Sequence, residues 1–428
     1  MKIVPPTEFL NRMRVTLGGE FAAFEGVYSL PAERAIRVNT LKISAEGFAK
    51  ISPFPLEGAV PWCGDGFYIS EEKPGLFPEH AAGLYYVQEP SAMCAAPLLK
   101  DIRGKTVLDL CSAPGGKGTQ LAAQMAGEGL LFLNEINFSR AKILSQNVER
   151  MGIKNAVVTV TSPAALAQNY AGFFDCVLVD APCSGEGMFR KEQTAIPEWS
   201  EQNVEMCARR QSEILDCAER LLKPGGRIVY STCTFAEAED EGQVQSFLSR
   251  HGAFTLLKQE KLYPHRVRGE GHFAALLQKD GAGEQSVCRP ARAAVKREAE
   301  KLWRGFEGQH LNTRFGNLCM VGEALYSLPQ GMPELSVQTL RAGVRLGEFT
   351  NGRFTPSHSL AMCLKQGEAG FFELDEKSAR AYIGGLTLPC NKSGWLVAAY
   401  KGYPLGWVKS SGGVAKNHYP KALRLILQ

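Results

Sequence analysis

Two cysteines in this 428-residue chain lie directly after predicted strands, where reactive side chains often occur. Cys183 closes the run DAPC that begins at Asp180, and Cys233 lies in the run STCT. Each run follows an apolar stretch typical of a buried strand. The carboxyl ends of parallel strands meet at one edge of a sheet, where ligands bind. A single such cysteine is more often a small buried hydrophobe, but two of them beside an aspartate favour catalysis in a shared pocket.

Two thiols and a carboxyl group suit methylation of a cytosine ring. A thiolate that adds to C6 makes C5 nucleophilic, and loss of the C5 proton and the thiol after methyl transfer restores the ring. A free thiol with a pKa of about 8.5 is only a few per cent ionised at neutral pH. We expect Asp180 to contact N3 and the exocyclic amine, and the second thiol to assist breakdown of the adduct. The target base must leave its stack to enter such a pocket.

A glycine turn upstream predicts the site of a cofactor. The run TVLDLCSAPGGKGTQ, residues 106–120, indicates a buried strand, a tight turn and the start of a helix,. A Walker loop needs Gly-Lys-Ser/Thr, but Gly118 follows Lys117, and a dinucleotide fingerprint needs a glycine where Ala113 stands. The remaining candidate is S-adenosylmethionine, which needs a glycine turn without a pyrophosphate cradle. Lys117 is expected to pair with Asp180 or a neighbouring acid.

The elements around this turn alternate as in a doubly wound α/β domain. Strands are expected near residues 107–110, 130–135, 156–160, 176–180 and 227–230, with a long helix over 204–222 and a shorter one near 91–99. Glu135 ends the second strand about 20 residues past the glycine turn, where a ribose-binding carboxylate belongs in such folds.

Composition and charge restrict the classes of protein to which this chain can belong. With 45% hydrophobic residues it can form two or three domains with cores,. No apolar run approaches the roughly 18 residues of a membrane span, and the start MKIVPPTEFLNR does not resemble a signal peptide,. Twelve cysteines without zinc-type pairs predict free thiols in the reducing cytoplasm and no metal site,. A monomer is the default expectation.

Charge and turn-rich stretches predict three regions: 1–90, 91–283 and 284–428. Residues 284–428 carry 19 lysines and arginines against 11 acidic residues, which suggests a polyanion-binding appendage,. It begins with a polar linker, and short apolar runs between glycines and prolines follow, typical of a small β-rich module. In the first region Arg37 and Asn39 share one face of an expected strand, as a solvated pair or as RNA contacts.

Several motifs resemble those of the NSUN/Sun-type RNA cytosine-5 methyltransferases. These are LDLCSAPGGKGTQLAA, VLVDAPCSGEGMFRK and YSTCTFAEAEDE. AIRVNTLK, YYVQEPSAM and GWVKSSGGVAKNHYPKALR resemble the bacterial RsmF branch of that family, so the resemblance covers most of the chain. It implies a Rossmann-like methyltransferase domain with an N-terminal RNA-recognition segment and a C-terminal PUA-like module. The implied substrate is small-subunit (16S) ribosomal RNA, free or in the small ribosomal subunit.

The resemblance also implies roles for individual residues. Cys233 is then the nucleophile, Cys183 the thiol that helps to release the product, and Asp180 a contact of both cofactor and cytosine. The cofactor site would comprise Glu135, Asp180 and the turn made of Cys111, Ser112, Ala113, Pro114, Gly115, Gly116 and Lys117. Many relatives hold the adenine edge with an aspartate after the third strand. This chain has Ser162 there, so Ser162 or a backbone group must serve.

Three alternatives remain open on the sequence alone. The thiols could exchange roles, as in DNA cytosine-5 enzymes, but a Cys183 nucleophile leaves Cys233 unexplained. The chain could act on transfer RNA. It could also be a non-catalytic RNA-binding or ribosome-assembly factor, against which the intact turn, Asp180 and both thiols argue.

Overall fold

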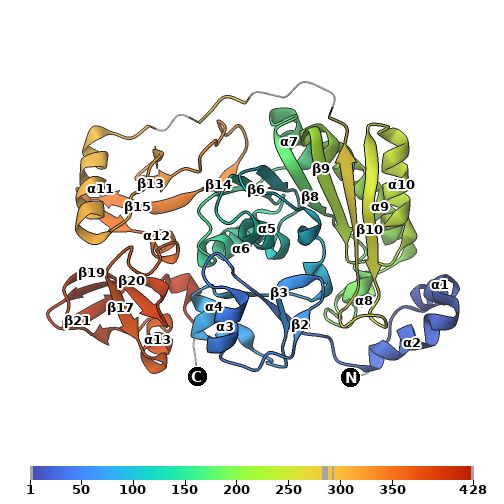
Figure 1. Ribbon diagram of the computed structural model, residues 1–428, viewed down its shortest axis with the longest axis horizontal. Coiled ribbons are helices and arrows are strands. Elements are labelled where there is room, and N and C mark those ends of the chain that lie inside the picture. Colours follow the sequence, from blue (N-terminus) through green and yellow to red (C-terminus); the bar gives the residue numbers. More distant parts are fainter. Residues whose placement is uncertain (1–2, 282–287, 292–293, 426–428) are drawn as a thin grey trace.

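An eight-stranded sheet forms the centre of the computed structural model, which describes residues 3–281, 288–291 and 294–425 (Figure 1). Five strands run parallel, as the alternating sequence pattern predicts, and three antiparallel strands extend the sheet at its two edges. In spatial order the strands are β10 (Phe254–Leu262), β11 (His272–Lys279), β9 (Leu222–Thr232), β8 (Phe174–Asp180), β5 (Thr106–Asp109), β6 (Leu130–Asn134), β7 (Ala156–Thr159) and β14 (Thr339–Ala342).

Helices cover both faces of this sheet because its strands are apolar on both sides. Successive side chains of a strand point to opposite faces, so Val107 and Leu108 of β5 enter different cores. The helices on the Val107 side are α5 (Gly116–Gln124) and α6 (Phe138–Arg150), and those on the Leu108 side are α7 (Pro163–Asn169), α9 (Glu201–Leu221) and α10 (Glu241–Arg250). Each fully buried leucine contributes about 2 kcal/mol. The result is a three-layer α/β/α domain.

The helix expected near residues 91–99 is replaced by two short 3₁₀ turns. They are η4 (Ser91–Met93) and η5 (Ala96–Leu98). Pro97 lies at the start of η5, and a proline has no N–H with which to continue a helix through this position,. The expectation of one helix is therefore wrong, and the segment packs against the sheet through Ala95 and Ala96.

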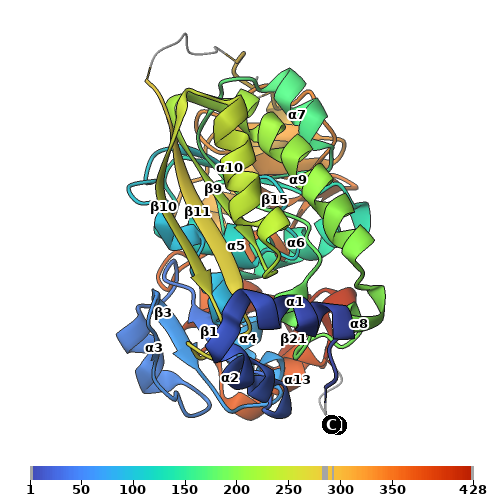
Figure 2. The same cartoon turned by 90° about the vertical axis from the view of Figure 1, so that its right-hand side faces the viewer.

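The N-terminal region combines a helical pair with a small antiparallel sheet. Residues Phe9, Met13, Phe21 and Phe24 are buried, as their helical spacing predicts. They lie in α1 (Thr7–Leu17) and α2 (Phe21–Gly26), which Figure 2 shows beside α8 (Ala195–Glu198). The sheet has the order β2 (Ala59–Val60), β3 (Cys63–Tyr68), β1 (Ala35–Val38) and β4 (Tyr85–Val87), and α3 (Ala45–Ile51) and α4 (Pro78–Ala81) accompany it.

The C-terminal region is rich in strands, as predicted, and forms two further sheets, which Figure 1 draws at the left, on the side opposite to α1 and α2. The first contains β12 (Leu318–Val321), β13 (Ala324–Ser327), β15 (Val344–Thr350) and β16 (Arg353–Pro356), with α11 (Arg297–His310) and α12 (His358–Met362). The second contains β17 (Phe371–Leu374), β19 (Gly394–Tyr400), β20 (Tyr403–Ser411), β21 (Val414–Asn417) and β18 (Leu388–Pro389), with α13 (Glu376–Ile383) and η8 (Lys421–Leu423).

The boundary expected near residue 283 falls within residues 282–287, outside the described part of the chain. Strand β14, which follows that boundary, pairs with β7 and so completes the central sheet. The C-terminal region is thus joined to the α/β domain by a shared sheet. Among the described residues, none of the helices combines the length and the apolar character needed to cross a bilayer.

Candidate active site

The two cysteines meet at the carboxyl edge of the sheet. Strands β8 and β9 stay paired up to Asp180 and Ser231, and each then enters a loop that carries one thiol. The sulfurs of Cys183 and Cys233 lie 3.3 Å apart, and the Cys233 N–H donates to the Cys183 sulfur at 3.4 Å. Both residues are partly buried. The hydrogen bond with Cys233 and burial together raise the pKa of Cys183, which keeps this residue a thiol at neutral pH.

Asp180 lies beside these thiols between two partners. The Lys117 ammonium is 2.9 Å from one carboxylate oxygen, as the sequence predicts, and the Ser231 hydroxyl donates to the other at 3.0 Å. The Lys117 side chain is only 8% exposed, whereas that of Asp180 is 34% exposed and remains accessible to a ligand. Burial alone would lower the pKa of Lys117, but the charge and hydrogen bond of Asp180 outweigh it and raise that pKa. The lysine therefore remains a cation.

The glycine turn leaves polar atoms that a ligand can use. Both carboxylate oxygens of Asp109 and the Ser112 hydroxyl are buried and lack a hydrogen-bond partner among the described residues. A Cβ at Gly118 would approach the Ser112 hydroxyl to 2.6 Å, so only glycine allows the helix to begin so close to them. Unpartnered buried polar groups are rare in proteins. Acceptors of this kind suit the positively charged amino and sulfonium groups of S-adenosylmethionine.

Asp109 is a further candidate for the cofactor site, and it was not singled out from the sequence. Burial raises its pKa to about 7, and the nearby Ser112 hydroxyl offsets this only in part, without making a hydrogen bond of normal geometry. The sequence contains a feature that could have indicated this role, because Asp109 is an acidic residue within the apolar run that forms β5.

Glu135 and Ser162 follow the next two strands, at the same edge. Glu135 is buried, and Arg140 connects it to the turn by contacting its carboxylate at 3.3 Å and donating to the Ala113 carbonyl at 2.9 Å. Ser162 is the N-cap of α7, where its oxygen accepts from the Ala165 N–H at 3.2 Å. The Ser162 hydroxyl proton remains available to donate a hydrogen bond to a ligand. The ribose and adenine roles of these two residues stay predictions.

Arg37 and Asn39 do not form the RNA-contacting pair that the sequence suggested, because both side chains are completely buried. Arg37 donates to the Gly116 carbonyl at 3.1 Å and to the Thr119 hydroxyl at 2.7 Å. Asn39 donates to the carbonyl oxygens of Gly83 and Met151. The expectation of RNA contacts is therefore wrong, and Arg37 instead anchors the glycine turn from the N-terminal sheet.

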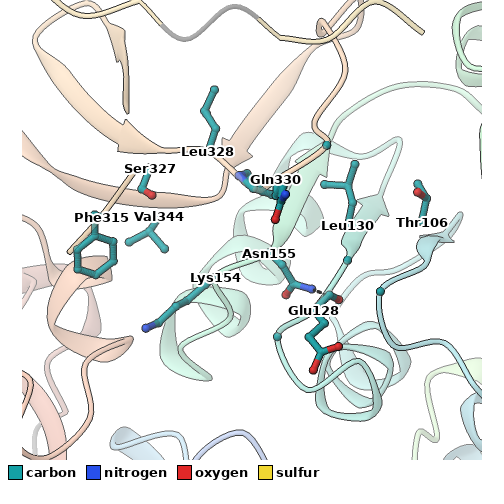
Figure 3. A pocket seen from close by; sticks show the side chains of 15 residues that line it. Thr106, Glu128, Leu130, Lys154, Asn155, Phe315, Ser327, Leu328, Gln330 and Val344 are labelled. Carbon is teal, nitrogen blue, oxygen red and sulfur yellow. Dashed lines mark hydrogen bonds between the residues drawn. The ribbon is translucent and has the colours of Figure 1, made fainter. Parts of the chain in front are cut away.

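A separate hollow of about 670 Å³ lies between the central sheet and the first C-terminal sheet (Figure 3). Thr106 and Leu130, the first residues of β5 and β6, line it, so it opens at the edge of the sheet opposite the thiols. Its charged lining residues are Glu128 and Lys154, and no cysteine lines it. In the described part of the chain, no three His, Cys, Asp or Glu side chains gather as metal ligands would.

The three-layer sheet, its glycine turn and the polar edge beside it define a Rossmann-like methyltransferase that uses S-adenosylmethionine. Consecutive family models match the chain: the N-terminal domain of 16S rRNA methyltransferase RsmF (residues 6–90), 16S rRNA methyltransferase RsmB/F (96–278), the RsmF rRNA methyltransferase first C-terminal domain (305–364) and the methyltransferase RsmF PUA domain (369–425). The chain belongs to the ribosomal RNA small subunit methyltransferase F family.

Whole-length relatives place the chain in this family. It is 32% identical to ribosomal RNA small subunit methyltransferase F of Aeromonas hydrophila, over 98% of this chain and 97% of the relative. It is 33% identical to the Klebsiella pneumoniae protein of the same name, over 98% and 96%. The match thus extends through both C-terminal modules.

Solved structures resemble about two thirds of the chain. A methyltransferase homologue from Pyrococcus horikoshii has a TM-score of 0.58 and 28% identity, and it covers 64% of this chain and 95% of its own. NSun6 from the same organism, solved with the S-adenosylmethionine analogue SFG, has a TM-score of 0.57, 20% identity and coverages of 64% and 98%, a likeness of fold.

Proposed function

We propose that this protein transfers a methyl group from S-adenosylmethionine to C5 of a cytosine in 16S ribosomal RNA, in the cytoplasm, through a covalent adduct. The observation that carries the proposal is the pair of thiols 3.3 Å apart beside the Lys117–Asp180 ion pair. A glycine turn follows the neighbouring strand β5, and the buried acceptors beside it have no hydrogen-bond partner in the described part of the chain. The cofactor, held by residues 111–117, Asp109 and Glu135, supplies an electrophilic methyl group.

Each side chain has a separate task in this reaction. Cys233, as thiolate, adds to C6 of the flipped cytosine and makes C5 a carbon nucleophile. Asp180, fixed by Lys117 and Ser231, is placed to contact N3 and the exocyclic amine while negative charge enters the ring,. After methyl transfer, water or hydroxide from the solvent takes the C5 proton, and the electrons of that C–H bond restore the C5–C6 double bond and expel the Cys233 sulfur as a thiolate. Cys183, which its raised pKa keeps as a thiol, lies 3.3 Å from the departing sulfur and can stabilise the Cys233 thiolate by donating a hydrogen bond to it.

Two alanine variants test this assignment. With S-adenosylmethionine and 16S rRNA, Cys183→Ala should accumulate an RNA adduct that resists denaturation, and Cys233→Ala should form none. The opposite pattern would assign the nucleophile to Cys183. Methyl transfer from labelled cofactor to transfer RNA and not to rRNA would show that transfer RNA is the substrate. Transfer to neither RNA would favour a non-catalytic RNA-binding factor. Within rRNA, bisulfite sequencing would locate the modified cytosine.

A further inference from the structure

Two buried carboxylates connect the loops that carry the thiols. Glu186, three residues after Cys183, accepts a hydrogen bond from the Phe235 N–H in the other loop at 3.1 Å. Glu239, six residues after Cys233, accepts from the Ser184 N–H in the first loop at 3.0 Å. Each loop therefore sends one carboxylate to the backbone of the other. We refer to the side chains of Glu186 and Glu239 with these two contacts as the clasp.

The clasp is fully enclosed by the protein. Both side chains are completely buried. The other oxygen of Glu186 accepts from Arg12 of α1 and from the Trp199 indole N–H, the latter at 2.8 Å. Glu239 accepts from the Gln211 amide at 2.8 Å. Buried carboxylates hold their geometry when hydrogen bonds satisfy them in this way.

The chain between the clasp and the thiols is short and confined. The Gly187 N–H donates to the Cys233 carbonyl at 2.9 Å. A Cβ at Gly187 would lie 3.0 Å from that carbonyl oxygen and 2.9 Å from the Gly271 carbonyl oxygen, so the loops cannot tolerate a larger residue there without shifting. The regular pairing of β8 and β9 ends at Asp180 and Ser231. Beyond this point the hydrogen bonds of the clasp connect the two loops.

We propose that Glu186 and Glu239 are positioning residues that set the distance between the Cys183 and Cys233 sulfurs. This rests on the proposed function, in which the Cys233 sulfur attacks the cytosine and the Cys183 thiol assists the departure of that sulfur. Neither carboxylate touches the substrate. A misplacement of about 1 Å at a reacting group can reduce a rate about a hundredfold, so the clasp matters for turnover although it lies behind the reacting atoms.

The hydrogen-bond partners predict opposite results for the same isosteric change in the two carboxylates. All three partners of Glu186 are donors, so the NH₂ group of Glu186→Gln must face a donor in either orientation,. In Glu239→Gln, the amide oxygen can keep the Ser184 and Gln211 donors. Its NH₂ group can donate to the Ser184 hydroxyl, whose own proton can turn to Thr234, 2.8 Å away. Glu239→Gln should therefore preserve the clasp and Glu186→Gln should break it.

Cross-linking the two thiols measures their separation without RNA. The oxidant diamide accepts the two electrons and two protons that Cys183 and Cys233 lose on forming a disulfide. Mass spectrometry of the peptide pair follows the rate. We expect rates equal to or above the wild-type rate in Glu239→Gln, and rates at least about tenfold lower than wild type in Glu186→Gln and Glu239→Ala. Removing the negative charge of either glutamate favours ionisation of the thiols, which by itself would accelerate disulfide formation in all three variants. A slower reaction therefore indicates a larger separation of the two sulfurs.

Equal rates in Glu186→Gln and the wild type, or in Glu239→Gln and Glu239→Ala, would overturn the proposal. If Glu186→Gln does not fold, the two Glu239 variants decide alone. With RNA, Glu186→Gln should lower kcat while the KM for S-adenosylmethionine stays unchanged, and an unchanged kcat would contradict the proposal. Because cross-linking needs no methyl transfer, the clasp and the proposed function can fail separately.

Discussion

Replacing Asp109 by asparagine should stabilise the protein and weaken its cofactor binding. The wild-type carboxyl group is completely buried at the end of β5, and neither oxygen has a hydrogen-bond partner among the described residues. Asparagine has almost the same shape and no charge. The substitution therefore removes the cost of a buried carboxylate and keeps the packing of the strand.

The magnitude follows from the pKa of Asp109. Burial raises it to about 7, from 3.8 for an unperturbed aspartate. The folded state therefore binds a proton more tightly than the unfolded state does, and stability decreases as the pH rises from about 4 to about 7. Below that window both states are protonated and the cost vanishes. Above it a shift of about 3 units corresponds to a cost on the order of 4 kcal/mol, which asparagine should abolish.

Urea unfolding of both proteins between pH 5 and 8.5 measures this difference. The stability gain of Asp109→Asn should grow with pH and level off above about pH 7. Asp101→Asn is the matched control, because Asp101 is exposed and its left-handed backbone suits asparagine,. It should show no such pH dependence. A constant difference between Asp109→Asn and the wild type over the whole range would refute the reasoning.

The cofactor should respond in the opposite direction. A hydrogen bond to a charged group contributes about 1.5–3 kcal/mol, so Asp109→Asn should raise the Kd for S-adenosylmethionine about 10- to 100-fold in calorimetry. Unchanged affinity would remove Asp109 from the cofactor site. Stability gained together with binding lost is the pattern of a residue retained for function.

Two further substitutions test how the site is held. Arg37→Met removes the hydrogen-bond donors to Gly116 and Thr119, so it should destabilise the protein by about 1–3 kcal/mol and raise the Kd for the cofactor. RNA affinity, measured by filter binding, should stay unchanged. A selective loss of RNA affinity would instead support a role of Arg37 in RNA contacts. Gly187→Ala should cost about 1–3 kcal/mol and reduce methyl transfer, because its methyl group would press on the Cys233 carbonyl. The control Gly308→Ala, in α11 with open space around it, should be neutral or stabilising in thermal unfolding,, and equal effects of the two alanines would contradict this account.

The sequence predicted the central sheet well because its signals are local. An apolar run that ends in an acid or a thiol identifies both a buried strand and the side chain at its carboxyl edge. Parallel order then brings Asp180, Cys183 and Cys233 together without further information. The pairing of Lys117 with Asp180 follows in the same way, since α5 begins directly after β5 and therefore starts at the same edge.

The contacts that hold this edge in place were beyond the sequence because their partners are distant in the chain. Glu186 lies 174 residues from Arg12. Arg37 looked like half of an exposed polar pair, because strand alternation assigns it a face but does not show what covers that face. Its partner Thr119 lies 82 residues away. The alternation of side chains shows only that Arg37 lies on the opposite face of the strand from its apolar neighbours. The tertiary structure is needed to show that the α/β domain covers this face.

These long-range contacts connect the N-terminal region to the α/β domain. The resemblance implies an RNA-recognition segment over residues 1–90, and two arginines of this segment contact the α/β domain. Arg37 holds the glycine turn at one end of the site, and Arg12 neutralises Glu186 at the other. Strand β14 similarly joins the C-terminal region to the far edge of the same sheet. A displacement of either flanking region would therefore disturb the glycine turn, the loop that carries Glu186 or the β7 edge of the central sheet.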